Sequence, residues 1–368
     1  MISQSELGVR FLTRWALQAF VSGIIAAVLV RLSETVLLRL FDLRDAFGVN
    51  PFIGAIGAAL FAGLVLYRIA PGASGEGIPA YLEAIRDRDA DLPLLDSVIK
   101  YPAAIVTLGF WGSGGAVGPL GRVVAGLAQS TTIAFQRIFP RLFADQDSHT
   151  VHYHAPTTAA IGGMAAAVAA IFHAPIAGAV FAVEIIQSDQ LRYHQLFPAL
   201  LSSASAVFIA EIMGWPAPVR MVGTAYAPEA LAIIPIAAVG LFSGLIGRFY
   251  TTLYRFLAHR TGRYRNKHRV FRLVVGMVVA AALSTAFHPV IGGTSYELPL
   301  ILGLGDIGSL TILWLPVHAA VLLLVLAFVK MLSNCVTVAS GMSAGFTGPA
   351  GLVGMTAGAA VALLLGYP

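Results

Sequence analysis

The sequence predicts an all-α, polytopic membrane protein made of tilted and discontinuous helices in two inverted repeats. Hydrophobic residues make up 58% of the chain and charged residues 11%, whereas a soluble globular domain carries about a quarter charged residues. Apolar stretches without Asp, Glu, Lys or Arg recur along the chain, and several reach the roughly 20 residues that a spanning helix needs. The clearest are Trp15–Val30, Phe52–Tyr67, Tyr101–Gly121, Ala155–Val183, Ala230–Gly247 and Leu310–Val329.

Glycine and proline interrupt the apolar stretches at four places with one layout: a small residue, then proline, then an apolar run. These are Gly75–Pro79 (GEGIP), Gly115–Pro119 (GAVGP), His173–Pro175 (HAP) and Gly345–Pro349 (GFTGP). Proline is favoured in the first turn of a helix because its missing N–H is not needed there. A helix break in a membrane is tolerated only where it faces protein or water. Each place therefore predicts a helix N-terminus within the membrane.

A shift of 230 residues superposes two segments without a gap. The matched pairs are Lys100/Lys330, Thr107/Thr337, Ser113/Ser343, Gly115/Gly345, Gly118/Gly348, Pro119/Pro349 and Gly121/Gly351. This fixed register predicts two related membrane repeats, residues 1–215 and 216–368. Inverted repeats whose broken helices meet at mid-membrane are a recurrent plan of transporters.

The excess positive charge gathers in Arg248–Arg272 and does not indicate nucleic-acid binding. By the positive-inside tendency, we expect this segment to be a cytoplasmic loop. Arg10 and Arg14 precede the first apolar stretch, and no small-residue cleavage site follows it, so we expect an uncleaved first helix.

Helix N-termini supply the chemistry of an anion site. The first N–H groups of a helix have no partner within it, and the helix dipole adds about half a positive charge at that end. Several such ends together therefore bind a small inorganic anion without a cationic side chain. The predicted anion-binding residues are Gly75, Glu76, Gly77, Ile78, Pro79, Gly115, Ala116, Val117, Gly118, Pro119, Gly345, Phe346, Thr347, Gly348 and Pro349.

These motifs resemble those of the CLC chloride channel and transporter family. The family motifs GSGIP, GREGP and GxFxP match Gly75–Pro79, Gly115–Pro119 and Gly345–Pro349 in the same order, and FNAPLAGxxFxxEE matches Phe172–Ile185. Gly292–Glu297 also looks like a family segment. The resemblance implies a CLC-like fold, transport of a chloride-type anion, and bound chloride or another halide rather than a cofactor. It also implies a homodimer embedded in membrane lipid, in the plasma (inner) membrane of a prokaryote.

Two glutamates of the family motifs are replaced in this chain. Val117 stands at the family's gating glutamate, and Ile185 stands at its internal proton acceptor; Glu184 matches the first glutamate of that pair. Because proton coupling needs titratable carboxylates, we predict passive, channel-like conduction that is not coupled to protons. The alternative is a proton-coupled antiporter that uses Glu76, Glu184 or both as substitute carboxylates. A membrane scaffold that transports nothing is a third hypothesis.

Glu76 stands where the family has a serine that helps to hold the central anion. Its carboxylate has three options: to take up a proton, to occupy the anion site as a tethered competitor, or to turn away and pair with a basic group. An ionisable residue within a membrane is a functional candidate by default. We hypothesise that Glu76 makes conduction pH-dependent by alternately blocking and freeing the site. For Phe346, we expect the amide to contact the anion and the ring to pack.

Other chemistry is not expected. His152, His154 and His173 fit no metal-ligand spacing, and we find no Ser-His-Asp or paired-carboxylate arrangement, so we predict neither a metal site nor an enzyme. We expect the second repeat to be shortened at its C-terminus relative to the family, because the chain ends soon after the third motif. Tyr367 does not match the family's pore tyrosine.

Overall fold

The computed structural model describes residues 4–86, 92–140, 155–186, 193–219, 233–262, 268–287, 291–294 and 318–365. The α-helices are α1 (Gln4–Ala46), α2 (Pro51–Arg68), α3 (Ile78–Arg86), α4 (Leu94–Gly109), α5 (Val117–Ile138), α7 (Ala155–Phe172), α8 (Pro175–Glu184), α9 (Tyr193–Ile212), α10 (Ile233–Gly262), α11 (Arg269–Ala286), α13 (Ala319–Ser340) and α14 (Thr347–Leu364), with a 3-10 turn η1 (Pro71–Ala73). Within these ranges, β-pairing is limited to two isolated bridges. The all-α prediction is confirmed.

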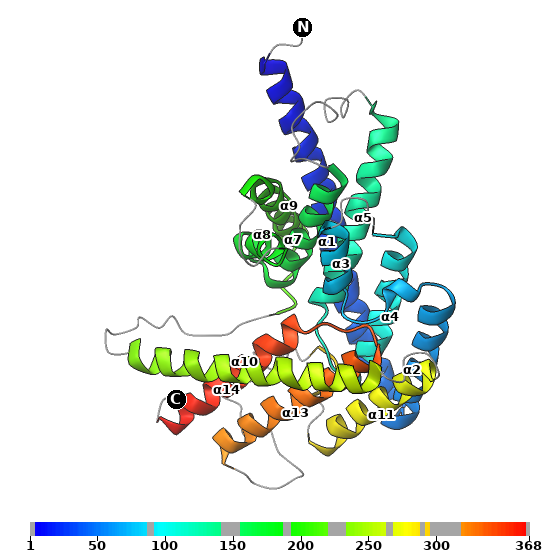
Figure 1. The fold of residues 1–368 in the computed structure, drawn as a ribbon, viewed down its shortest axis with the longest axis vertical. Helices are drawn as coiled ribbons and strands as arrows, with labels where there is room; N and C mark the ends of the chain where they lie inside the picture. The colour runs from blue at the N-terminus through cyan, green and yellow to red at the C-terminus, as the bar shows by residue number, and fades with distance from the viewer. Residues whose placement is uncertain are drawn as a thin grey trace.

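The helices form two groups (Figure 1). In the first group, α1, α5, α7 and α9 pack against one another, and α8 covers α7 and α9. In the second group, α10, α11 and α14 all pack against α13 and run across the direction of α1. α5 of the first group contacts α14 of the second. α2, which belongs to neither group, packs on α11.

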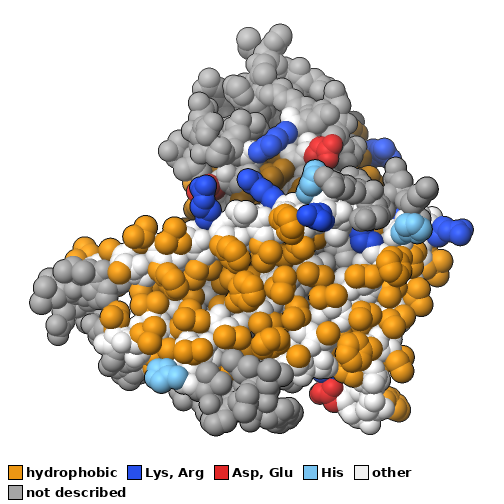
Figure 2. Space-filling model, turned by 60° about the horizontal axis from the view of Figure 1, so that its bottom comes forward, with side chains coloured by type: hydrophobic (Ala, Val, Ile, Leu, Met, Phe, Trp, Pro, Cys, Tyr) orange, Lys and Arg blue, Asp and Glu red, His pale blue; other side chains and the backbone are white. Residues whose placement is uncertain are grey.

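Eight of the described helices are long and apolar enough to cross a membrane. Of the residues of α7, 94% are buried, as expected for a helix that is hydrophobic on all sides and lies inside a bundle. By contrast, α10 is largely exposed, and the face shown in Figure 2 carries a broad band of hydrophobic side chains with most Lys, Arg and His side chains along its border. A soluble monomer rarely exposes so large an apolar surface. The protein is an integral, multi-pass membrane protein.

The predicted helix breaks lie where the motifs placed them. The chain leaves α4 at Gly109 and enters α5 at Val117, and it leaves α13 at Ser340 and enters α14 at Thr347. Between α7 and α8 only His173 and Ala174 are non-helical, and α8 begins at Pro175. α3 begins at Ile78, so that Pro79 lies in its first turn.

The prediction of a loop over Arg248–Arg272 is wrong for most of that segment. α10 continues to Gly262, and α11 begins at Arg269. The arginines there alternate with Leu, Phe, Tyr and Ala, and arginine is itself a good helix former, so the basic charge does not end the helix.

Several predictions concern residues outside the described ranges. These are the metal-spacing argument for His152 and His154, the family-like residues 295–297, and the comparison made for Tyr367. The boundary between the two repeats, at residues 215 and 216, stays a prediction.

Candidate anion site

The backbones of Gly115 and Gly345 pair with each other. The Gly115 N–H donates to the Gly345 carbonyl at 2.9 Å, and the Gly345 N–H donates to the Gly115 carbonyl at 2.8 Å, in an antiparallel bridge. Each residue thus binds its own counterpart under the 230-residue shift. A Cβ on Gly345 would lie 2.9 Å from the Gly115 oxygen and 3.1 Å from the Gly118 nitrogen, which explains why a glycine is needed there.

This pair brings the N-termini of α5 and α14 together. The residues preceding the two helices are Ala116 and Phe346, and neither helix has a side-chain cap. The first N–H groups of both helices therefore lack the partner that a Ser, Thr or Asp cap provides. Val117, Gly118 and Pro119 are buried. The start of α14 is similar: Gly348 and Pro349 are buried, and Thr347 is half-buried.

The third element is the loop before α3. Gly75 and Gly77 have φ angles of +71° and +107°, which side-chain-bearing residues rarely adopt. A Cβ on Gly77 would lie 2.7 Å from the Lys100 Cε and 3.0 Å from the Gly118 oxygen. The first motif therefore packs directly against the second.

Lys100 holds this loop from α4. Its buried ammonium donates to the carbonyls of Ala73 at 3.0 Å and Gly75 at 2.7 Å, and to the Ser343 hydroxyl at 3.2 Å. These three bonds match the three protons of an ammonium group. The same cation attracts the Glu76 carboxylate.

Glu76 connects the first motif with the third. Its Oε1 accepts a hydrogen bond from the Phe346 N–H at 3.4 Å. Its Cγ lies 3.1 Å from where a Cβ on Gly118 would stand, so the side chain crosses the start of α5 on its way to α14. Of the three options for Glu76, this geometry corresponds to a carboxylate that rests among helix N-termini.

The Phe346 ring packs against two tyrosines of α10. It meets the Tyr254 ring edge-on with 4.5 Å between centroids and the Tyr250 ring with 5.7 Å. This agrees with the packing interpretation of the ring.

Other predicted positions are not brought to Glu76. Glu184 is exposed at the C-terminal end of α8, where it forms no ion pair within the described part of the chain. Ile185 is half-buried against the apolar core. The N-terminus of α8 faces outward, with Ile176 71% exposed. Three of the four predicted helix starts thus converge, and the fourth does not.

Sequence reasoning missed three neighbours of the site. Asn334 on α13 and the two tyrosines Tyr250 and Tyr254 on α10 all contact it. Asn334 is a polar residue in the mostly apolar sequence that follows Lys330, and this was the signal that could have identified it. No sequence feature distinguished the two tyrosines, because aromatic residues are common in membrane helices.

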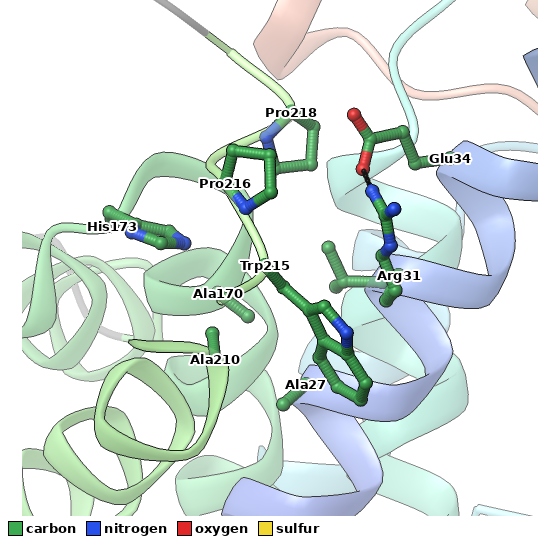
Figure 3. Close-up of a pocket in the computed structure, with 10 residues that line it drawn as sticks. Ala27, Arg31, Glu34, Ala170, His173, Ala210, Trp215, Pro216 and Pro218 are labelled. Carbon is green, nitrogen blue, oxygen red and sulfur yellow. Dashed lines mark hydrogen bonds and ion pairs between the residues drawn. The ribbon is translucent and has the colours of Figure 1, made fainter. Parts of the chain in front are cut away.

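A separate small pocket lies between α1, the α7–α8 turn and the segment after α9 (Figure 3). It is lined by Trp215, His173 and an ion pair between Arg31 and Glu34 at 2.8 Å. None of its lining residues belongs to the three converging motifs.

Comparison with known proteins decides the family. The family model described as voltage gated chloride channel matches residues 58–367. The chain belongs to this family. A chloride/fluoride channel protein of Pseudomonas syringae pv. tomato is 24% identical over 61% of this chain and 48% of its own length. An uncharacterized protein of Methanocaldococcus jannaschii is 23% identical over 79% of this chain and 66% of its own length. The chain thus spans about half of the first relative's length and about two thirds of the second's.

A solved member of the family confirms the fold. The crystal structure of a CLC-type fluoride/proton antiporter superposes with a TM-score of 0.80, over 100% of this chain and 84% of that chain, at 18% identity. The predicted CLC-like bundle is therefore confirmed.

Proposed function

We propose that this protein carries small inorganic anions across a membrane, past the N-termini of α5 and α14. The position of Glu76 supports this proposal most directly. The carboxyl oxygen Oε1 of Glu76 rests within hydrogen-bond distance of the Phe346 N–H, at uncapped helix ends. A free anion needs the same donors and the same positive end of the helix dipole. It can take this place when the carboxylate withdraws.

The transport mode we propose is passive conduction without proton coupling. The position of the family's gating glutamate is Val117, which is fully buried in the apolar core. The position of the proton acceptor is Ile185, and the neighbouring Glu184 is exposed. Of the two family positions that would relay a proton, at Val117 and Ile185, neither carries a carboxylate. Glu76 then acts as a tethered competitor that an anion displaces.

Proton-coupled antiport is the second candidate. Two observations favour it: the fold likeness to a fluoride/proton antiporter, and a titratable carboxylate at the site itself. Glu76 would then carry the proton in exchange for the anion.

Anion efflux from proteoliposomes with simultaneous pH recording separates these functions. The purified protein is reconstituted with a chloride or fluoride gradient, and valinomycin with potassium clamps the membrane potential at zero. Passive conduction runs the halide gradient down without moving protons. Antiport drives protons against their own gradient at a fixed ratio to halide. Absence of halide flux beyond that of protein-free liposomes would contradict both candidates and favour a scaffold.

The remaining expectations are part of this proposal. A halide binds at the helix ends, the protein forms a homodimer in lipid, and it resides in the inner membrane of a prokaryote. Light scattering of the protein in detergent, corrected for bound detergent, tests the dimer.

A further inference from the structure

Asn334 joins four segments of the chain at the candidate site. It is fully buried on α13, one helical turn after Lys330. Its Nδ2 donates to the carbonyls of Ser113 and Gly345, each at 3.1 Å, and its Oδ1 accepts from the Tyr250 hydroxyl. Reversing the amide would set its oxygen against two carbonyl oxygens, so these partners fix its orientation.

The Gly345 carbonyl is held from two sides. It accepts from the Asn334 Nδ2 at 3.1 Å and from the Gly115 N–H at 2.9 Å. In a trans peptide, the carbonyl of one residue and the N–H of the next point in opposite directions within one rigid plane. Fixing the Gly345 oxygen therefore fixes the direction of the Phe346 N–H. That N–H is the group that donates to Glu76.

The first half lacks this support. Under the 230-residue shift, position 334 corresponds to Ala104, which has no hydrogen-bonding side chain. The Gly115 carbonyl accepts the Gly345 N–H at 2.8 Å but gains no side-chain amide from position 104. The amide that starts α14 is thus anchored by a group for which the start of α5 has no equivalent.

We propose that Asn334 is a positioning residue of the anion site: by holding the Gly345 carbonyl, it aims the Phe346 N–H at the bound anion. The ligand class is a small monovalent anion, either a free halide or the tethered carboxylate of Glu76. This inference rests on the proposed function. It identifies a residue that acts through the backbone and touches no anion itself.

The test measures halide affinity where Glu76 does not compete. Glu76→Gln protein in detergent is titrated with chloride, and separately with fluoride, by isothermal titration calorimetry. Adding Asn334→Leu, which has a similar size and no hydrogen-bonding group, should weaken binding of the preferred halide at least tenfold. Thr337→Val in the same background is the matched control. Thr337 accepts from the Ser113 N–H at 3.1 Å, so this variant also removes a buried bond to Ser113 but none to Gly345.

The control should bind halide within twofold of the Glu76→Gln protein, although both variants lower thermal stability. Equal affinity in Asn334→Leu and Glu76→Gln overturns the positioning role and leaves the proposed function intact. Equal losses in Asn334→Leu and Thr337→Val also overturn it, since general loosening would then suffice. Absence of halide binding to Glu76→Gln itself contradicts the proposed function, and this inference with it. If the leucine variant does not fold, Asn334→Ser replaces it with the same expected loss and the same overturning result.

Discussion

Lys100 and Lys330, which match under the 230-residue shift, each hold a loop through two backbone carbonyls. The Lys100 ammonium donates to the Gly75 carbonyl at 2.7 Å, and the Lys330 ammonium donates to the Gly293 carbonyl at 3.1 Å. Each also binds a second carbonyl two residues earlier. A buried ammonium is costly unless several acceptors surround it, and an irregular loop in a membrane needs donors for its carbonyls. Each lysine satisfies both requirements at once.

Replacing either lysine by methionine should therefore lower stability strongly. Each substitution leaves two carbonyls without their donor, both buried for Lys330 and one buried and one half-buried for Lys100, at about 1–3 kcal/mol for each buried carbonyl. Thermal unfolding in detergent measures the effect, with the exposed Arg260→Met as the control that loses a cation without buried acceptors. If Lys100→Met or Lys330→Met unfolds at the wild-type temperature, these bonds are not structural.

Gly345→Ala should disrupt the site because of crowding. Its Cβ would press on the Gly115 oxygen and the Gly118 nitrogen, which are backbone atoms that cannot rotate away. Overpacking of this kind costs about 1–3 kcal/mol, and we expect halide flux to fall at least tenfold. Gly351→Ala, on the helix α14 that follows Gly345, is the control, since a Cβ there meets no atom within 4 Å. Flux of Gly345→Ala at the level of Gly351→Ala would contradict the close approach of the two halves.

Glu76→Gln should raise halide flux at neutral pH and flatten its pH dependence. In the wild-type protein, the ionised carboxylate competes for the Phe346 N–H, and taking up a proton removes that competition. Wild-type flux should therefore rise as pH falls, whereas the variant should conduct similarly from pH 5 to 8. Flux from liposomes at a series of pH values measures both profiles. The control is Glu83→Gln, which changes an exposed carboxylate on α3, the short helix that follows the Glu76 loop. Superimposable profiles for all three proteins would exclude a gating role for Glu76.

Tyr254→Ala should loosen the Phe346 ring. The two rings meet edge-on at 4.5 Å, and aromatic pairs of this geometry contribute about 0.5–1.5 kcal/mol beyond their buried area. We expect a lower unfolding temperature and weaker halide binding for the alanine variant. Tyr254→Phe keeps the ring and should match the wild type in both measurements. A loss in Tyr254→Phe as large as in Tyr254→Ala would assign the effect to the hydroxyl group instead.

The converging helix starts could be predicted from sequence because their determinants are local. Proline in a first turn and glycine before it mark the starts of α3, α5 and α14 within each motif. The register of 230 residues paired Gly115 with Gly345 and Lys100 with Lys330, although it did not say that the two glycines touch.

The other contacts arise from packing between distant segments, which no local pattern encodes. Asn334 binds Ser113 across the two halves, and the repeat hides it because its counterpart is Ala104. The outward turn of α8 escaped notice for a related reason. His173–Pro175 has the same local layout as the other breaks, but its packing against α7 and α9 directs that helix start away from the site. The prediction of a loop over Arg248–Arg272 was wrong because basic residues indicate on which side of the membrane a segment lies. They do not indicate where a helix ends.

The bridge between Gly115 and Gly345 bears on how such a chain can arise. Each glycine hydrogen-bonds with its own counterpart, so the contact requires the same residue on both sides and no difference between the two halves. Two separate copies of one half-length chain, related by a two-fold axis, can form such a contact without any adaptation. Gene fusion then needs only a connecting segment, and differences such as Asn334 against Ala104 can accumulate afterwards on either side of an interface that already existed.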